Sequence, residues 1–473
     1  MFRLLITFVL LTFFLSPKGN TQVIAMSEDL YLKNDIAYFL LGSYQDTFAL
    51  FRDLDHEYKL HTYDDSMLPV DEINFEFDFR KLRIVDVLND GQGAFNIYYF
   101  GKRKGLIYLN AEKYTIHGER LDSTTLVVYD DLIEFPNYQI EFSDDESKVL
   151  LYEIKSKSEL DVTVIDNNNF KLVSHNLFNN SAFDLYYDFE QILISNTSQI
   201  FIVSSKKKFV SKKVNPYFLI HYLPNNVDQF ETIEIPFCEY RNYSGKFIFD
   251  NLNNKLTGAG LYANRKLFKG MGYYFISIPM NDLSNHTMVT KPFSRDYIMQ
   301  YLNRKKINKK SGIIDAEVKE IALRKDGGAL LIGEKVKLKE KVSGSRIESE
   351  MFRSDFFYEE IFMTSIHPSG QEHWKNIIHK RQYSFDDSGI FSSFYLLKTA
   401  QNLSIIFNDD IRSQSTVSQF TIKSNGEYKR KAILNTSDIE VKLRIKDALQ
   451  ISSNQIVIPS QFKNKLRLVK FTF

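Results

Sequence analysis

The segment Val162-Thr163-Val164-Ile165-Asp166-Asn167-Asn168-Asn169 contains the pattern that decides the fold, an extended apolar run followed by a polar turn. A second extended run comes after the turn, as expected of a β-hairpin. Three further clear copies indicate that this hairpin is the repeating unit of the chain. They are Phe275–Asn281, Thr364–Gly370 and Phe420–Gly426.

The turns recur at a regular interval, which indicates a repeat fold. With looser copies near Asp55, Asn110 and Asn225, the spacing is about 56 residues, apart from one interval of about 88 residues. Modules of this size predict a β-propeller, in which four-stranded blades surround a central channel. We therefore expect an all-β fold of eight blades, with seven as the alternative. The expected modules are 30–80, 81–133, 134–180, 181–239, 240–292, 310–382, 383–436 and 440–473.

The two ends of the array and its long interval need separate explanations. The last module is short, so an amino-terminal strand such as Ile36–Leu41 is expected to complete its sheet and close the ring. The long interval predicts an insertion at about 294–353. It contains one expected helix, Ser294–Asn303 capped by Ser294, and a stretch expected to lack regular structure, Lys337–Glu350. Two β domains that meet near 305–312 are the alternative.

The amino terminus has the features of an export signal. A basic start at Arg3 precedes the apolar run Leu4–Leu15, and small residues follow near Ala25. An apolar run of about 12 residues is too short to cross a membrane as a helix. We expect a cleaved signal peptide at 1–25, with cleavage after Thr21 as the alternative, and a single propeller domain at 26–473. Membrane anchoring is the competing interpretation.

Composition restricts the partners and the compartment. The 60 Lys and Arg residues almost cancel the 59 Asp and Glu residues, so a nucleic-acid partner is not expected. The single cysteine, Cys238, excludes an internal disulfide. A large exported chain of this kind suits the periplasm or the cell surface of a Gram-negative bacterium. No transmembrane helix is expected, and the protein is expected to be a monomer.

Three segments resemble a known family of repeats. Phe142–Leu151 is similar to the strand pair of WD40-like and TolB-like propellers, with Glu146-Ser147 where that family often has a glycine. Ala322–Leu331 repeats the same motif with glycines present. His367–Trp374 resembles a hairpin of secreted Bacteroidota propellers. The resemblance implies the propeller fold, and fold in this class carries little information on function.

Acidic doublets are the most suggestive polar feature. Their oxygens suit calcium, and converging carboxylates suit acid–base catalysis. However, each doublet follows a strand, where Asp commonly hydrogen-bonds its own turn. We therefore expect turns, with calcium and catalysis as alternatives. The doublets are Asp64-Asp65, Asp130-Asp131, Asp144-Asp145, Asp386-Asp387 and Asp409-Asp410.

Other candidate groups have simpler structural explanations. A metal site at His367, His373 and His379 would require the three imidazoles to converge, and the turn at Ser369-Gly370 separates the first from the others. Gly91-Gln92-Gly93 and Gly258-Ala259-Gly260 are expected in hairpin turns, and Cys238 is expected to be a buried thiol. The lysine runs are expected to be solvated tips. These runs are 206–213, 304–306 and 309–310.

These observations favour a binding protein over an enzyme. The chain has no nucleophile elbow, no zinc-binding His-Glu-x-x-His and no phosphate-binding glycine loop. We expect an exported, non-catalytic propeller that binds a protein or carbohydrate partner through its blade loops, without a cofactor. The alternative is a propeller glycosidase or lyase with carboxylates at the channel mouth. A further alternative comes from the terminal Phe471-Thr472-Phe473, which is typical of outer-membrane barrels, although many strands here are apolar on both faces.

Overall fold

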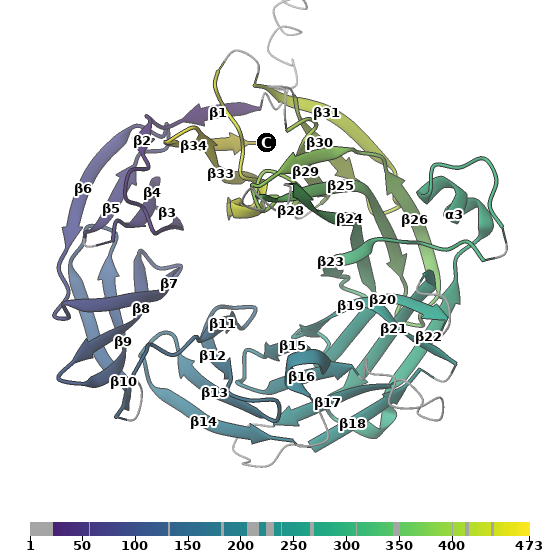
Figure 1. Cartoon of the computed structure of the whole chain (residues 1–473), viewed down its shortest axis with the longest axis horizontal. Coiled ribbons are helices and arrows are strands. Elements are labelled where there is room, and N and C mark those ends of the chain that lie inside the picture. Colours follow the sequence, from purple (N-terminus) through teal and green to yellow (C-terminus); the bar gives the residue numbers. More distant parts are fainter. Residues whose placement is uncertain are drawn as a thin grey trace, which may run out of the picture.

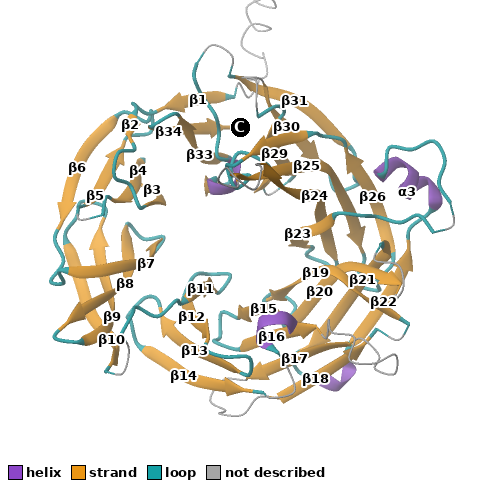
Figure 2. Ribbon diagram, viewed as in Figure 1, coloured by secondary structure: helices purple, strands orange, loops and turns teal. Residues whose placement is uncertain are grey.

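The computed structural model shows a ring of eight antiparallel β-sheets around a central opening (Figure 1). Strands make up almost all of the regular structure, and the few helices are short (Figure 2). The prediction of an eight-bladed all-β propeller is confirmed. The structure describes residues 22–55, 57–130, 133–180, 184–205, 217–223, 231–237, 239–264, 269–308, 310–343, 351–399, 401–411, 416–436 and 439–473.

Each blade contains four strands, and the first of them lies nearest the central opening. The strands of blades 1 to 4 are β3 (Ala37–Tyr44), β4 (Thr47–Asp53), β5 (Tyr58–Tyr63) and β6 (Pro69–Phe75); β7 (Lys81–Asn89), β8 (Ala94–Arg103), β9 (Leu106–Thr115) and β10 (Arg120–Tyr129); β11 (Gln139–Phe142), β12 (Lys148–Ile154), β13 (Glu159–Asp166) and β14 (Leu172–Asn179); β15 (Phe189–Ile194), β16 (Ile200–Ser205), β17 (Tyr217–Leu223) and β18 (Glu231–Pro236).

Blades 5 to 8 follow the same plan, and the last blade takes its fourth strand from the amino-terminal part of the chain. Their strands are β19 (Tyr240–Asp250), β20 (Lys255–Asn264), β21 (Gly270–Pro279) and β22 (Thr287–Pro292); β23 (Ala316–Leu323), β24 (Ala329–Ser343), β25 (Met351–Ile366) and β26 (Glu372–Ile378); β28 (Tyr395–Lys398), β29 (Leu403–Asn408), β30 (Thr416–Ile422) and β31 (Tyr428–Asn435); β32 (Leu449–Ser452), β33 (Gln455–Phe462), β34 (Lys465–Thr472) and β1 (Val23–Met26).

A few elements lie outside this plan. Within the described residues, two short strands add to existing blades, and four short helices occupy connections. The two strands are β2 (Leu30–Tyr31), which pairs with β34, and β27 (Gln382–Phe385), which pairs with β25; the short helices are α2 (Leu185–Asp188), α3 (Arg295–Tyr301), η1 (Leu283–Asn285) and η2 (Ile445–Asp447).

The continuous apolar runs form the middle strands of the blades. In β8, the side chains of Ile97, Tyr98, Tyr99 and Phe100 are at most 1% exposed. Both faces of such a strand are covered because each blade packs against its two neighbours in the ring. Outer strands such as β10 are largely exposed, since nothing covers them on the outside. The core of the protein therefore lies between blades and follows the ring.

The strand that closes the ring is β1, and the prediction that Ile36–Leu41 closes it is wrong. β1 pairs with β34 from Val23↔Thr472 to Met26↔Val469. Ile36–Leu41 falls instead at the start of blade 1, because the tight turn after Tyr44 pairs β3 with β4. Phe471 is buried within β34, in the third strand of blade 8.

The repeated hairpins share one turn geometry. In seven turns the N–H of the fourth residue donates to the carbonyl of the first, and that fourth residue has positive φ. This combination is expected of a type I turn followed by a left-handed residue. Glycine, which has no Cβ, takes this conformation without strain in four of the seven turns. The left-handed residues are Met67, Gly118, Glu146, Ser198, Gly327, Gly370 and Gly426.

Three of these turn glycines also make room for a side chain of the preceding blade. A Cβ on Gly426 would lie 2.6 Å from the ring of Trp374, whose Nε1 donates to the carbonyl of Ser424 at 2.8 Å. Gly118 and Gly370 accommodate Ile73 and Val289 in the same way. The turn that defines the repeat is thus also an interblade contact.

The long interval contains the expected helix. α3 begins after Ser294, whose Oγ accepts a hydrogen bond from the N–H of Tyr297 at 3.2 Å. Tyr297, Ile298 and Tyr301 of this helix are buried in one apolar cluster with strands of blades 5 and 6. Residues 294–353 also include β23 and β24, so this range contains blade strands as well as the helix.

The prediction that Lys337–Glu350 lacks regular structure is wrong for its first part, Lys337–Ser343. Lys337–Ser343 is part of β24, which pairs with β25 out to Ser343↔Met351. Backbone pairing with β25 overrides the high content of lysine in this segment. The stem of Lys339 also lies against an aromatic ring, with Nζ 5.4 Å from the centroid of Phe357. Residues 344–350 lie outside the described residues.

Within the part of the chain that the structure describes, no helix is long and apolar enough to cross a membrane.

Candidate functional site

The antiparallel order of the blades separates the connections into two faces. The turns after the first and third strands lie on one side of the ring, here called the turn face. The loops after the second strands and the links between blades lie on the opposite side, here called the linker face. Functional groups on the two faces therefore cannot share one site.

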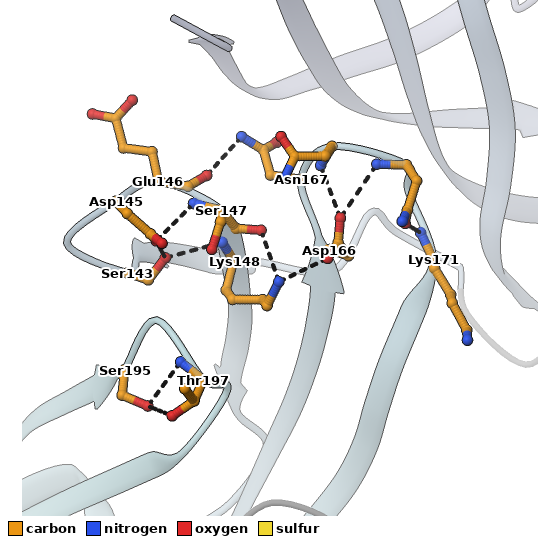
Figure 3. Close-up of polar contacts among 12 residues, drawn as sticks. Ser143, Asp145, Glu146, Ser147, Lys148, Asp166, Asn167, Lys171, Ser195 and Thr197 are labelled. Atoms are coloured by element: carbon orange, nitrogen blue, oxygen red, sulfur yellow. Dashed lines mark hydrogen bonds and ion pairs between the residues drawn. The ribbon is translucent and has the colours of Figure 1, made fainter. Parts of the chain in front are cut away.

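The doublet Asp144-Asp145 lies in the turn between β11 and β12 of blade 3, on the turn face. Its second residue, Asp145, stabilises that turn (Figure 3). One carboxylate oxygen of Asp145 accepts hydrogen bonds from Ser143 Oγ at 2.8 Å and from the N–H of Ser147 at 3.1 Å. Burial alone would raise the pKa of Asp145, but these hydrogen bonds lower it overall. The carboxylate is thus held as an anion by its own turn, as expected.

Three of the other doublets also make contacts within their own blades. Asp64 accepts from the N–H of Leu68 at 2.8 Å, and Asp387 accepts from Ser384 Oγ at 2.7 Å. Asp409 accepts from Ser418 Oγ at 2.7 Å and pairs with Arg430 at 2.9 Å. Among the described residues, no three acidic, histidine or cysteine side chains are grouped so that they could hold a metal ion. Asp131 lies outside the described residues.

The structure brings together two of the three histidines. The rings of His367 and His373 face each other across the turn of blade 6, with centroids 4.8 Å apart. Nδ1 of His373 lies 3.0 Å from a guanidinium nitrogen of Arg324, which donates to it. His379 lies at the other end of β26, where its Nδ1 is 3.8 Å from Glu360. Because Arg324 donates to Nδ1 of His373, the lone pair of that nitrogen is already used and is not available to a metal ion.

The glycine pairs have different environments. Gly91 and Gly93 occupy a hairpin turn with φ of +71° and +94°, as expected. Gly258 and Gly260 lie instead inside β20, and the prediction of a turn there is wrong. They are needed because the rings of Phe247 and Tyr274 occupy the space of their missing Cβ atoms. Cys238, 206–213 and Lys309 lie outside the described residues.

A groove on the linker face lies between blades 1 and 2 and has a volume of about 840 Å³. Its floor is aromatic, and Phe77 lies at its centre with ring centroids 4.9 Å from those of Tyr58 and Tyr99. Phe79 packs over Gly101 of β8, where any side chain would collide with the ring. Phe135, from the link between blades 2 and 3, completes the apolar surface. This volume suits a small ligand or several residues of an extended chain.

Charged groups of opposite sign flank this groove. Asp53 and Asp55 come from the β4–β5 loop, whereas Arg80 and Arg83 come from the link to β7 and from β7 itself. Burial raises the pKa of Asp53, whose carboxylate accepts from the N–H of Asp55 at 3.2 Å. Arg83 is fixed over the ring of Phe135 at 5.8 Å, and burial lowers its pKa. The groove thus offers carboxylates, guanidinium groups and an apolar floor to one ligand.

The segment that contributes most of the groove's aromatic floor has a sequence pattern that predicts a different structure. Asn74–Phe79 alternates apolar and polar residues and therefore predicts one half-buried strand, but β6 ends at Phe75. The residues after Phe75 form the link to blade 2, and their phenylalanines, Phe77 and Phe79, both line the groove. Alternation outside a strand, next to a link between modules, is the signal that could have identified the groove.

Asp86 is a carboxyl group on the inner strand of blade 2 with an unusual environment. It lies in β7 at a break in the pairing register with β8. Its carboxylate accepts one local hydrogen bond, from the N–H of Val87 at 2.8 Å. Burial raises the pKa of Asp86 from 3.8 to about 6. The ionised form of Asp86 is therefore disfavoured in the folded protein relative to the unfolded chain.

We expect Asp86→Asn to stabilise the protein at neutral pH. Because the folded pKa lies above the unfolded one, the carboxylate destabilises the native state at pH values above about 6, and this effect disappears below about pH 4. The variant should unfold with a free energy about 3 kcal/mol higher at pH 7, and the difference should nearly vanish at pH 4. Urea unfolding across this pH range measures the difference.

Asp122→Asn provides a matched control. Asp122 is exposed, lies at a similar register break in β10, and accepts from the N–H of Ser123 at 2.8 Å. Its replacement should leave the pH profile of stability unchanged. If Asp86→Asn follows the wild-type profile throughout, the environment inferred for Asp86 is wrong.

Comparisons with known proteins give neither a family nor a function for this chain. No family model and no curated protein matches the chain. Similar solved structures include an uncharacterised protein from Listeria monocytogenes, with 11% identity, a TM-score of 0.38 and coverage of 77% of this chain and 85% of that chain. The propeller domain of the Trilobed protease from Pyrococcus furiosus has 10% identity and a TM-score of 0.37, covering 83% and 97%.

A third similar structure is dipeptidyl peptidase 4 from Porphyromonas gingivalis. It shares 9% identity with a TM-score of 0.44, and the match covers 90% of this chain and 56% of that chain. At these identities and TM-scores, the three likenesses carry no argument about this chain. The class of protein is therefore defined by the architecture described above, an eight-bladed β-propeller closed by its amino-terminal strand.

Proposed function

We propose that this chain is an exported, non-catalytic β-propeller that binds a protein segment or a glycan in the groove between blades 1 and 2. The observation that carries the proposal is the groove itself, an aromatic floor flanked by Asp55 on one wall and Arg80 on the other. Aromatic side chains with a few oriented polar groups are typical of binding sites. The links that build it belong to the face where sequence can vary without disturbing the blades.

The groove residues also suit this role energetically. Buried rings in the centre of a site and charged groups at its rim are the usual arrangement of tight binding surfaces. Phe77 and Phe79 are already held by neighbouring rings and by Gly101, so a ligand would meet a preformed surface. Preformed sites lose less conformational entropy on binding.

A pair of variants tests the groove. Glycan and peptide arrays probed with the labelled protein should identify ligands, and affinities for them should fall at least about tenfold in Phe135→Ala and in Arg80→Glu. Arg120→Glu is the control, because Arg120 is an exposed arginine of the same blade at the turn face. Ligands that bind all variants equally well would place the site elsewhere and overturn the proposal.

The enzymatic alternative also has one supporting observation. Asp53, with its raised pKa, lies beside Asp55 in a groove that is large enough for a sugar chain. Two carboxyl groups in unlike environments are the arrangement used for glycoside cleavage. Hydrolysis of an array glycan that is lost in both Asp53→Asn and Asp55→Asn would favour this alternative over binding alone.

Export is part of the proposal and has a structural constraint. We place the mature protein in the periplasm or on the surface of a Gram-negative cell, as a monomer without a cofactor. Signal cleavage after Ala25 would remove most of β1, whereas cleavage after Thr21 would leave this strand whole. The position after Thr21 is therefore the one we propose.

A further inference from the structure

A second cavity lies in the wall of the central channel, on the side of the ring away from the groove. It has a volume of about 470 Å³ and is formed by β23, β28, β32 and η2 of blades 6, 7 and 8. β23 and β28 both border the central opening (Figure 1). We call it the channel pocket and define it by Lys319, Glu320, Lys398, Lys446 and Gln450, which line it.

The charges in the channel pocket are predominantly positive. It is lined by three lysines and one glutamate. Lys319 pairs with Glu317 at 2.7 Å, and Lys398 pairs with Glu320 at 2.9 Å. Among the described residues, Lys446 has no carboxylate within ion-pair distance. One of the three ammonium groups in the pocket therefore lacks an anionic partner.

Lys446 is instead held by an aromatic residue beneath the pocket. Its Nζ donates to the hydroxyl of Tyr358 at 2.9 Å and lies 4.9 Å from the centroid of that ring. Nζ of Lys319 and Nζ of Lys380 lie near the same ring, each 5.8 Å from its centroid. Tyr358 is 6% exposed, so its buried ring gives Lys446 and Lys319 of the pocket a common contact.

Lys446 is partly buried, and the loss of hydration of its ammonium group is only partly compensated by its protein contacts. Burial lowers the pKa of Lys446, although nearby carboxylates raise it in part. A partly desolvated ammonium group gains stability from an anion placed beside it. Behind the wall, Lys380 is paired with Glu334, and Nζ of Lys442 lies 3.8 Å from the ring centroid of Phe391.

We propose that the channel pocket binds an oxyanion, the carboxylate or phosphate group of a small molecule or of a chain end, through Lys446 with Lys319 and Lys398 beside it. Lysines can supply charge-assisted hydrogen bonds to either group. The amide of Gln450 is engaged by the backbone of Lys398, so the pocket wall is fixed in position before the ligand arrives.

Titration of the whole protein with inorganic phosphate and with citrate, followed by calorimetry, tests this inference. Sodium chloride at matched ionic strength serves as the reference for charge screening. We expect at least one of the two anions to bind with a defined affinity that chloride does not reproduce. Phosphate binding without citrate binding would assign the site to phosphate groups, and the reverse would assign it to carboxylates.

Variants then locate the binding. Lys446→Met should weaken the affinity at least about tenfold, whereas Lys446→Arg, which keeps a cation at this position, should retain most of it. Lys423→Met is the control, since Lys423 is an exposed lysine of blade 7 at the turn face, paired with Glu427. Should Lys446→Met fold poorly, Lys319→Met with Lys398→Met makes the same test.

The inference is overturned if neither anion binds more tightly than chloride, or if Lys446→Met and the double variant bind as wild type does. The groove variants Phe135→Ala and Arg80→Glu should leave anion affinity unchanged, because they lie in blades 1 and 2. Failure at one site is therefore distinguishable from failure at the other.

Discussion

A chain that begins at Ser27 is expected to lose about 6–8 kcal/mol of unfolding free energy relative to one that begins at Gln22, because it lacks β1. About four backbone hydrogen bonds to β34 would be lost, each worth about 1 kcal/mol. Ile24 and Met26 would also leave the apolar cluster between blades 7 and 8. Each such side chain contributes a further 1–2 kcal/mol or so when it is partly buried.

Loss of β1 should also change how the protein associates. β34 would become the outer strand of blade 8 along most of its length, with unpaired backbone groups. Exposed strand edges pair with other chains, so dimers or larger species are expected. Size-exclusion chromatography and urea unfolding of the two chains measure both effects.

Val23→Ala in the longer chain serves as the control for this prediction. Val23 is 57% exposed, so its truncation should change stability by less than about 0.5 kcal/mol while β1 remains paired. The contacts just after the strand are shared by both chains, including the ion pair of Asp29 with Arg467 at 2.7 Å. Equal stability of the two chains would show that the ring holds without its amino-terminal strand.

The closing strand shows where sequence reasoning succeeds and where it stops. Periodic turns identify the blades because each turn has a local geometry with its own residue preferences, as at Gly426 and Gly370. The helix at Ser294 is equally local, since its cap and its apolar face lie within one short segment. Features of this kind could be predicted from the chain alone.

Features that depend on distant partners could not be predicted in this way. Ile36–Leu41 and Val23–Met26 are both short extended runs, and only pairing with β34 distinguishes the second as the closing strand. Gly258 and Gly260 look like turn residues until the rings of neighbouring strands are placed over them. The groove has the same origin, because its two walls come from different blades.

A buried ion pair between Glu334 and Lys380 is a polar feature that no local sequence pattern predicts. The two residues are far apart in sequence, yet Nζ of Lys380 lies 2.6 Å from the carboxylate of Glu334, with side-chain exposures of 1% and 0%. Ser393 Oγ donates to the same carboxylate at 2.6 Å, and Lys380 donates to Gln382 at 2.6 Å. Gln382 in turn donates to the carbonyl of Asn408, which connects blade 6 to blade 7.

Removal of either charge alone is expected to cost about 3–5 kcal/mol of unfolding free energy, because the remaining charge stays buried without its partner. Glu334→Gln and Lys380→Met test this by urea unfolding. The double variant should cost much less than the sum of the two single variants, since it leaves no unpaired charge. Equal and additive losses would show that the two groups do not interact.

The two single variants should also respond to pH in opposite directions, which separates loss of charge pairing from simple loss of packing. Burial already lowers the pKa of Lys380 in the wild-type protein, and Glu334 raises it in part. In Glu334→Gln the folded pKa of Lys380 lies further below its unfolded value, so the unfolded state binds more protons and stability relative to wild type rises with pH. In Lys380→Met the lone carboxyl of Glu334 is expected to have a raised pKa, and relative stability should rise as pH falls. A packing defect would give the same loss at every pH, so parallel profiles for the two variants would contradict the ion-pair explanation.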